Sequence, residues 1–151
     1  MLFTFFGVNI ESQIDALKKY FDEIKVSKTL LLSPNSEFIY QSESVAKKDV
    51  LKFYRIYSYN TNPKKMTGEI EKMTKYNERK KDLERRIKIL EKSDLFKDKN
   101  ELKKLEQMHT LGKVNFDSVV VLDFGERLKS VLTSFMFFDV SSDEVNFFTI
   151  N

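Results

Sequence analysis

Basic and tyrosine side chains are concentrated in one part of this sequence. Residues 44–92 hold 15 basic and 7 acidic residues, a net charge of +8, whereas the whole chain of 151 residues carries only +3. Lysine and arginine bind phosphate groups, and tyrosine rings stack on exposed bases. The pattern therefore suits contact with nucleic acid, which is one of three interpretations of this segment. The candidate binding residues are Lys72, Lys75, Arg79, Lys80, Arg85, Arg86, Tyr54, Tyr57, Tyr59 and Tyr76.

The same basic segment has two other interpretations. Several of its cations follow an acidic residue at the spacing of salt bridges on a solvent-exposed helix. Arginine, which binds phosphate in a bidentate manner, is also sparse beside lysine. A solvated helical arm, and an arm that contacts a protein partner, are therefore alternatives to nucleic-acid binding. The spaced pairs are Glu71–Lys75, Asp82–Arg86 and Glu84–Lys88.

A second group of candidate residues is acidic and lies in the C-terminal third of the chain. Carboxylate oxygens are the preferred ligands of Mg²⁺, and a bound Mg²⁺ could support cleavage of a phosphodiester. Aspartate is equally typical of tight turns, so the sequence assigns no metal ligands. A small metal-dependent phosphodiesterase or nuclease is thus a further alternative. The residues are Asp117, Asp123, Glu126, Asp139, Asp143 and Glu144.

Other chemistry is excluded by residue types that are missing or rare. The chain has no cysteine, which excludes disulfides, cysteine-containing zinc sites and thiol nucleophiles. Its one histidine, His109, and its four dispersed glycines provide neither a typical zinc site nor a phosphate-binding glycine loop. We therefore assign no catalytic residue, metal or cofactor, and the sequence favours a protein without enzymatic activity.

Composition also predicts where the protein acts. No apolar run approaches the ~20 residues that a membrane span requires, and residues 1–8 lack the features of a signal peptide. Together with the absence of cysteine, this predicts a cytoplasmic protein with no membrane partner. The bias toward lysine, asparagine and isoleucine is typical of a low-GC genome, such as that of a bacterium or virus.

The elements that position these residues begin with a strand and a helix. Residues 2–8 favour a strand, and an apolar stripe predicts a helix over 10–24. The continuous apolar run in 26–33 predicts a strand that is buried on both faces. Residues 37–41 favour a strand, and we expect 38–41 to pair with 50–59 as a hairpin. The stripe consists of Ile10, Ile14, Leu17, Phe21 and Ile24.

A long helical hairpin is predicted in the middle of the chain. Asn62 and Pro63 are a favourable cap and first residue for a helix over 62–92. Its heptad-spaced apolar seam is polar at the centre, so we expect a weak coiled-coil seam or one that leaves the body partway along. A second helix, with a capping box at 98–101 and a stop at Gly112, folds back on the first. The hairpin would span about residues 63–111.

The C-terminal part is predicted to be a meander of strands over 118–122, 128–140 and 145–150. The fold class we expect is α+β, in a single domain of residues 1–151. A mostly antiparallel sheet of six or seven strands is covered by the N-terminal helix, and the long αα-hairpin is inserted between its two groups of strands.

The functional hypothesis that follows is a non-catalytic binding protein, such as an adaptor, inhibitor or assembly factor. It would bind a protein partner, or a second copy of itself, through the helical arm or an apolar sheet face. Adjacent phenylalanines must point to opposite faces of a strand, so both faces are covered or one is available for binding. The phenylalanines concerned are Phe135, Phe137, Phe138, Phe147 and Phe148.

Overall fold

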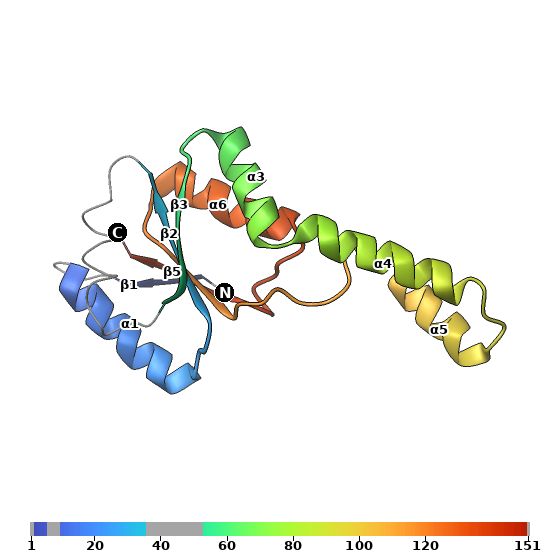
Figure 1. Ribbon diagram of the computed structural model, residues 1–151. Helices are drawn as coiled ribbons and strands as arrows, with labels where there is room; N and C mark the ends of the chain where they lie inside the picture. Colours follow the sequence, from blue (N-terminus) through green and yellow to red (C-terminus); the bar gives the residue numbers. More distant parts are fainter. Residues whose placement is uncertain (1, 6–9, 36–52, 151) are drawn as a thin grey trace.

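Five parallel strands form the central sheet of the computed structural model, which describes residues 2–5, 10–35 and 53–150 (Figure 1). Their order across the sheet is β1-β5-β4-β2-β3, and every adjacent pair runs parallel. The first and third strands of the chain therefore lie at opposite sides of the order. The strands are β1 (Leu2–Phe5), β2 (Thr29–Pro34), β3 (Phe53–Tyr59), β4 (Ser118–Val121) and β5 (Asn146–Ile150).

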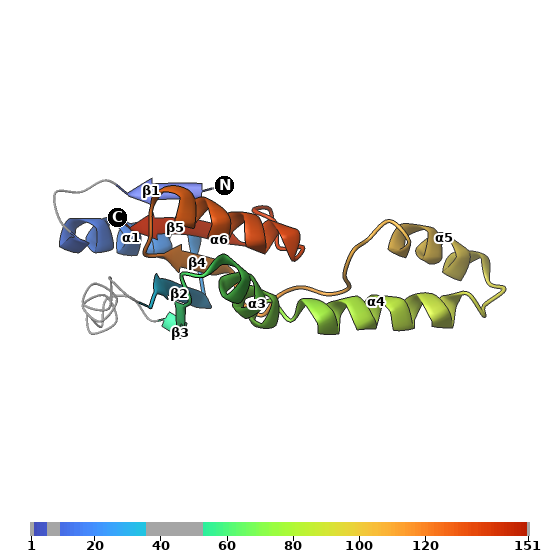
Figure 2. The same ribbon diagram turned by 90° about the horizontal axis from the view of Figure 1, so that it is seen from above.

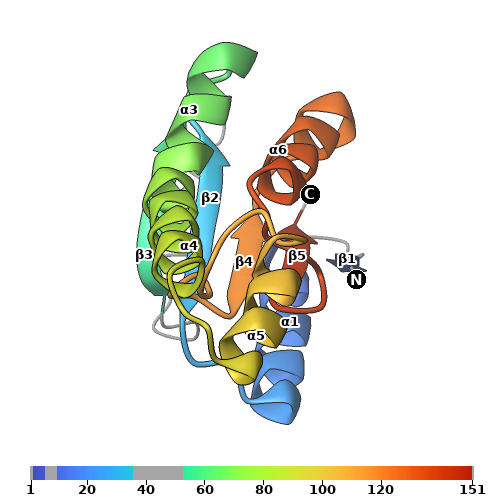
Figure 3. The ribbon, with the colours of Figure 1, turned by 90° about the vertical axis from the view of Figure 1, so that its right-hand side faces the viewer.

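Helices cover both faces of this sheet (Figure 3). Helix α1 (Ile10–Ile24) packs on one face, while α3 (Pro63–Met73) and α6 (Gly125–Phe137) pack side by side on the other. Two further helices, α4 (Tyr76–Leu90) and α5 (Phe96–Leu105), pack on each other and project away from the sheet as an arm (Figure 2). We call the sheet with α1, α3 and α6 the body.

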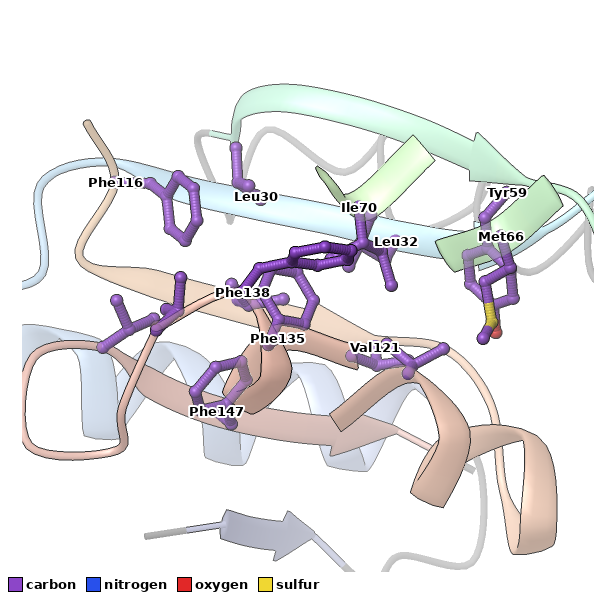
Figure 4. Packing of buried hydrophobic residues seen from close by; sticks show 14 residues of the cluster. Leu30, Leu32, Tyr59, Met66, Ile70, Phe116, Val121, Phe135, Phe138 and Phe147 are labelled. Carbon is purple, nitrogen blue, oxygen red and sulfur yellow. The ribbon is translucent and has the colours of Figure 1, made fainter. Parts of the chain in front are cut away.

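The core of the body consists of two apolar layers, one on each face of the sheet. Phe135 and Phe138 from α6 pack with Phe147 in the larger layer (Figure 4), whereas Phe148 belongs to the layer beneath α1. The prediction that adjacent phenylalanines point to opposite faces is therefore confirmed for β5. Strand β2 is buried along its whole length, as its continuous apolar run predicts, and so is β4.

The predicted antiparallel sheet is wrong, because all four strand pairs are parallel, and one source of the error is a misassigned segment. Residues 128–140 were expected to be a strand, but residues 125–137 form helix α6, which begins at Gly125 with a φ of 62°. Parallel strands need such a crossover, whereas an antiparallel meander needs only tight turns. With α6 between them, β4 and β5 run parallel instead of forming part of a meander.

The predicted helix over 62–92 is interrupted once. Asn62 caps α3 through hydrogen bonds to the next turn, as expected, but the helix ends at Met73. Lys75 then adopts a left-handed conformation, with φ 52°, and α4 begins after it. The seam divides at this break, because Met66 and Ile70 pack on the body, whereas the later leucines pack within the arm. A seam that leaves the body partway along is thus confirmed.

The second arm helix differs from the prediction at both ends. It is capped by Leu95, without a side-chain hydrogen bond, and Asp98 lies in its first turn, where it accepts a hydrogen bond from Ser93. It ends at Leu105, well before Gly112.

The predicted strand 37–41 lies outside the described residues, and β3 pairs in parallel with β2. None of the described helices combines the length and apolar character needed to cross a bilayer.

Candidate functional site

Cations and tyrosines meet in a groove beside β3. Three hollows with volumes of about 310, 50 and 330 Å³ adjoin one another there, because neighbouring hollows share lining residues. The first two lie between β3 and α3, and the third continues past the loop before β4. We call this track the β3 groove. Its cations and tyrosines are Lys28, Arg55, Lys72, Lys75, Lys113, Tyr54, Tyr57 and the buried Tyr59.

A β-bulge at the start of β3 turns side chains into this groove. Thr29 pairs with Phe53, but the next residue, Leu30, pairs with Arg55, so Tyr54 is an extra residue in the strand. Residues after the bulge are shifted by one position relative to the sheet faces. Arg55 consequently shares the face of Leu30, beneath α3, while the Tyr54 side chain remains 40% exposed.

Contacts between neighbours hold the groove side chains in place. The Lys28 Nζ lies 5.4 Å from the centre of the Tyr54 ring, and the Arg55 Cζ lies 5.5 Å from it, both at cation–π distance. Arg55 also donates a hydrogen bond of 3.3 Å to the Tyr57 hydroxyl, and this bond raises the pKa of the guanidinium. Arg55 therefore remains charged under all ordinary conditions.

The groove carries more positive than negative charge, because five cations and three carboxylates line it. Among the described residues, none of its five cations forms a salt bridge. The carboxylates are Glu69, Asp117 and Glu144, and the first two accept backbone hydrogen bonds. Glu69 accepts the Asn60 N–H at 2.8 Å, and Asp117 accepts the N–H groups of Ser27 and Lys28 at 2.8 and 3.0 Å. The groove thus offers several free ammonium groups to a ligand.

The arginines of the arm are arranged differently. Arg85 pairs with Asp82 at 3.2 Å, and Arg86 pairs with Glu101 at 2.8 Å. The expected pair between Asp82 and Arg86 is therefore replaced by two others. Each of these guanidinium groups already has a carboxylate partner, so the arm presents less free positive charge than its sequence indicates.

Arg79 lies inside the protein, where α4 meets the body. Its side chain is only 6% exposed. It donates hydrogen bonds to the carbonyl oxygens of Thr74, Phe138 and Asp139 at 3.0, 2.7 and 3.3 Å, and to the Thr110 hydroxyl at 2.9 Å. Burial lowers the pKa of Arg79, and the nearby Asp139 carboxylate counteracts this effect. Arg79 therefore joins the arm to the body rather than facing a ligand.

The other predicted binding residues are dispersed. Tyr59 is buried, Tyr76 packs its ring 5.2 Å from that of Phe138, and Lys80 is exposed on the arm. Of the residues predicted from the sequence, the structure brings together Lys72, Lys75, Tyr54 and Tyr57 in the β3 groove, and the buried Tyr59 lines its first hollow as well.

Three cations of the β3 groove were missed by sequence reasoning. Lys28, Arg55 and Lys113 are isolated cations in the sequence, and none belongs to a basic run on a helix face. Only the parallel pairing of β2 with β3, and the bulge within it, bring them to the tyrosines. The clustering of Tyr54 and Tyr57 around Arg55 was the one available signal.

A buried carboxylate lies at the opposite end of β4. Asp123 accepts hydrogen bonds from the hydroxyl of Tyr59 and from Arg127 Nε, the latter at 3.1 Å. Burial and the bond to Asp123 raise the pKa of Tyr59 far above its ordinary value. The cluster lies where the strand order reverses between β2 and β4, a common ligand position in α/β folds. Here the Asp123 carboxylate instead accepts hydrogen bonds from the protein's own side chains, Tyr59 and Arg127.

The predicted acidic candidates do not converge on a metal site. Asp117 lies before β4, Asp123 lies after it, and Asp139 accepts a hydrogen bond from Thr110 beside the arm. In the part of the chain that the structure describes, no three acidic or histidine side chains gather in a way that could hold a metal ion. The geometry gives no support to the metal-dependent hydrolase.

Large apolar side chains are exposed at the far end of the arm. Phe96 is 79% exposed and Leu95 is 66% exposed, and Ile89 in the last turn of α4 is 55% exposed. They surround the turn between α4 and α5, at the point farthest from the sheet (Figure 1). We call these three residues the arm tip.

Comparison with known proteins gives no further assignment. The chain matches no protein family model, no curated protein and no solved structure. Its function must therefore be inferred from the two surfaces just described, the β3 groove and the arm tip.

Proposed function

We propose that the protein is a non-catalytic binding protein that recognises a protein partner through its arm tip. The observation that supports this proposal is the exposure of Ile89, Leu95 and Phe96 at the end of a projecting helical hairpin. Soluble proteins expose single apolar residues freely, but an apolar group at the end of an extended element is typical of a contact surface.

The base of the arm favours a fixed direction for this tip. Arg79 forms its four hydrogen bonds across the junction, and the backbone N–H of Leu111 donates to the Arg79 carbonyl at 3.0 Å. Buried and satisfied polar groups of this kind specify one arrangement, because any other arrangement leaves donors unpaired. A fixed arm loses less conformational entropy on binding than a flexible one.

The chemistry of the tip indicates the kind of partner. Phenylalanine and leucine have no hydrogen-bonding side-chain groups, so they are recognised by an apolar pocket rather than by a charged or polar surface. Full burial of each such side chain contributes about 1.5–3 kcal/mol. Two anchors in a pocket would therefore account for a binding energy typical of a hot spot in a protein interface.

The test is to remove the anchor while leaving the fold unchanged. A partner is captured on the immobilised wild-type protein, identified and purified, and its Kd is measured by calorimetry. We expect Phe96→Ser to raise the Kd at least tenfold, which corresponds to the loss of about 1.4 kcal/mol. Because Phe96 is exposed, its replacement should change the free energy of unfolding by less than about 0.5 kcal/mol.

Phe137 provides a matched control, because it is 72% exposed but lies on α6 of the body. Phe137→Ser removes the same side chain from a different surface, and we expect the Kd to be unchanged. A partner that binds wild type and Phe96→Ser equally well, or one that is weakened as much by Phe137→Ser, would contradict recognition by the arm tip.

A further inference from the structure

We propose that the β3 groove binds single-stranded nucleic acid, at a site separate from the arm tip and independent of its function. The groove combines the two features that such a ligand requires, a track of free cations for the phosphates and aromatic rings for the bases. The rings come from β3 and the cations from the body and its adjoining loops, whereas the basic helix that the sequence emphasises lies mostly in the arm.

None of the groove's cations forms a salt bridge with a described residue, and they lie along one path. Lys72 borders the first and second hollows, Lys75 and Arg55 border the second, and Lys28 and Lys113 border the third. This places positive charge along the whole track rather than at one point. A chain with regularly spaced phosphates matches such a track better than a single anion does.

The tyrosines favour a single strand over other anionic chains. Tyr54 is 40% exposed, and the side chain of Tyr57 borders both hollows beside α3. Unpaired bases can stack on these rings, whereas a duplex keeps its bases stacked on each other. An acidic polypeptide would use the lysines but would gain little from the rings. Tyrosine variants therefore distinguish the proposed ligand from other polyanions.

The experiment measures fluorescence anisotropy of labelled oligo-uridine and oligo-deoxythymidine of about 15 nucleotides, within the ~4–16 that comparable grooves cover. Titrations at about 50 and 200 mM salt give the dependence of affinity on salt. We expect binding with a slope near −0.7 for each phosphate contacted. A labelled duplex of the same length should bind at least tenfold more weakly. Preference between the two single strands will show whether the ribose hydroxyl is recognised.

Two variants test the groove directly. In the first, Lys72→Ala is combined with Lys75→Asn, because asparagine tolerates the left-handed backbone at that position. We expect the salt slope to become about 1.4 smaller, for two lost contacts. In the second, Tyr54→Leu keeps an apolar side chain but removes the ring, and we expect about a tenfold loss of affinity with the slope unchanged.

The matched control is Lys103→Ala with Lys104→Ala, which removes the same charge from exposed positions on α5 of the arm. Affinity and slope should remain those of wild type. The proposal would be overturned by absence of binding at low salt, by equal effects of the groove and arm pairs, or by an unchanged affinity in Tyr54→Leu. The last result would mean that the groove accepts any polyanion. Because Phe96→Ser should leave this binding intact, failure of one proposal is distinguishable from failure of the other.

Discussion

The body and the arm are stabilised by different amounts of buried apolar surface. The body has an apolar layer on each face of its sheet, which together contain Leu30, Leu31 and Val120 among many fully buried side chains. The buried cluster of the arm consists of only three leucines, Leu83, Leu90 and Leu105, with partly buried neighbours. Stability is therefore unequal along the chain, and we expect the arm to open while the body remains folded.

The junction between the arm and the body differs from both regions, because it is held by buried polar groups instead of apolar side chains. Arg79 satisfies carbonyl groups from both sides, so the arm is attached mainly by directional hydrogen bonds. Such bonds add little net energy when they form, but the loss of one partner leaves buried groups unsatisfied at considerable cost. The comparison therefore predicts that a single residue at the junction matters more than any single residue within the arm.

The largest expected effect is that of Arg79→Met, which keeps an unbranched side chain but removes every donor. Two buried carbonyl oxygens and one part-buried carbonyl oxygen lose this donor, and the Thr110 hydroxyl keeps only its bond to Asp139. We expect the free energy of unfolding, measured by urea denaturation, to fall by about 3–5 kcal/mol. Arg85→Met removes an exposed guanidinium paired with Asp82 and should cost less than about 1 kcal/mol. Equal effects of the two variants would refute the polar junction.

An intermediate effect is expected from Leu90→Ala, within the arm cluster. Leu90 is 3% exposed, so the change leaves a cavity and costs about 2–3 kcal/mol, the low end for a small cluster. Hydrogen exchange of α4 and α5 amides should accelerate by about 30- to 150-fold, with body amides unchanged. Ile89→Ala, at the exposed neighbouring residue, should change neither the free energy of unfolding nor the hydrogen exchange of the arm amides. Faster exchange throughout the sheet would show that arm and body unfold as one unit.

The parts of the fold that follow from local pattern were predictable. The apolar stripe of α1 predicted the fully buried Ile14 and Leu17, and the continuous runs predicted β2 and β4. Helix α6 was not predicted, because its β-branched and aromatic residues favour a strand when taken one at a time. Its apolar positions from Leu128 to Phe138 in fact recur at helical spacing. That misassignment hid the crossover that lets β4 and β5 run parallel.

The candidate site was predictable only in part, for a related reason. Lys72 and Lys75 could be found from their spacing on a helix, and Tyr54 and Tyr57 from their density in a strand. Arg55 could not be assigned to the groove, because its direction depends on the bulge opposite Thr29. Arg79 looked like a phosphate ligand because a sequence does not show which face of a basic helix meets the body.

The smallest expected effect concerns Asp117, a carboxylate that ties the loop before β2 to the start of β4. Burial acts to raise its pKa, but hydrogen bonds from Ser27, Lys28 and Ser118 outweigh it, so the pKa of Asp117 is lowered. A carboxylate with a lowered folded-state pKa stabilises the protein above its unfolded value of about 3.9. That contribution is lost as the pH falls through the folded-state pKa.

Asp117→Asn should therefore lower the free energy of unfolding by about 1 kcal/mol at pH 7, because the amide nitrogen cannot accept these bonds. Below its folded-state pKa the wild type also loses the carboxylate, so the two proteins should converge in urea denaturation at acid pH. Ser27→Ala removes one side-chain donor and leaves both backbone donors, so it should show the same trend at smaller size. A difference that stays constant from pH 7 to the acid limit would mean that Asp117 acts through packing, and the link between β2 and β4 would then be apolar like the rest of the body.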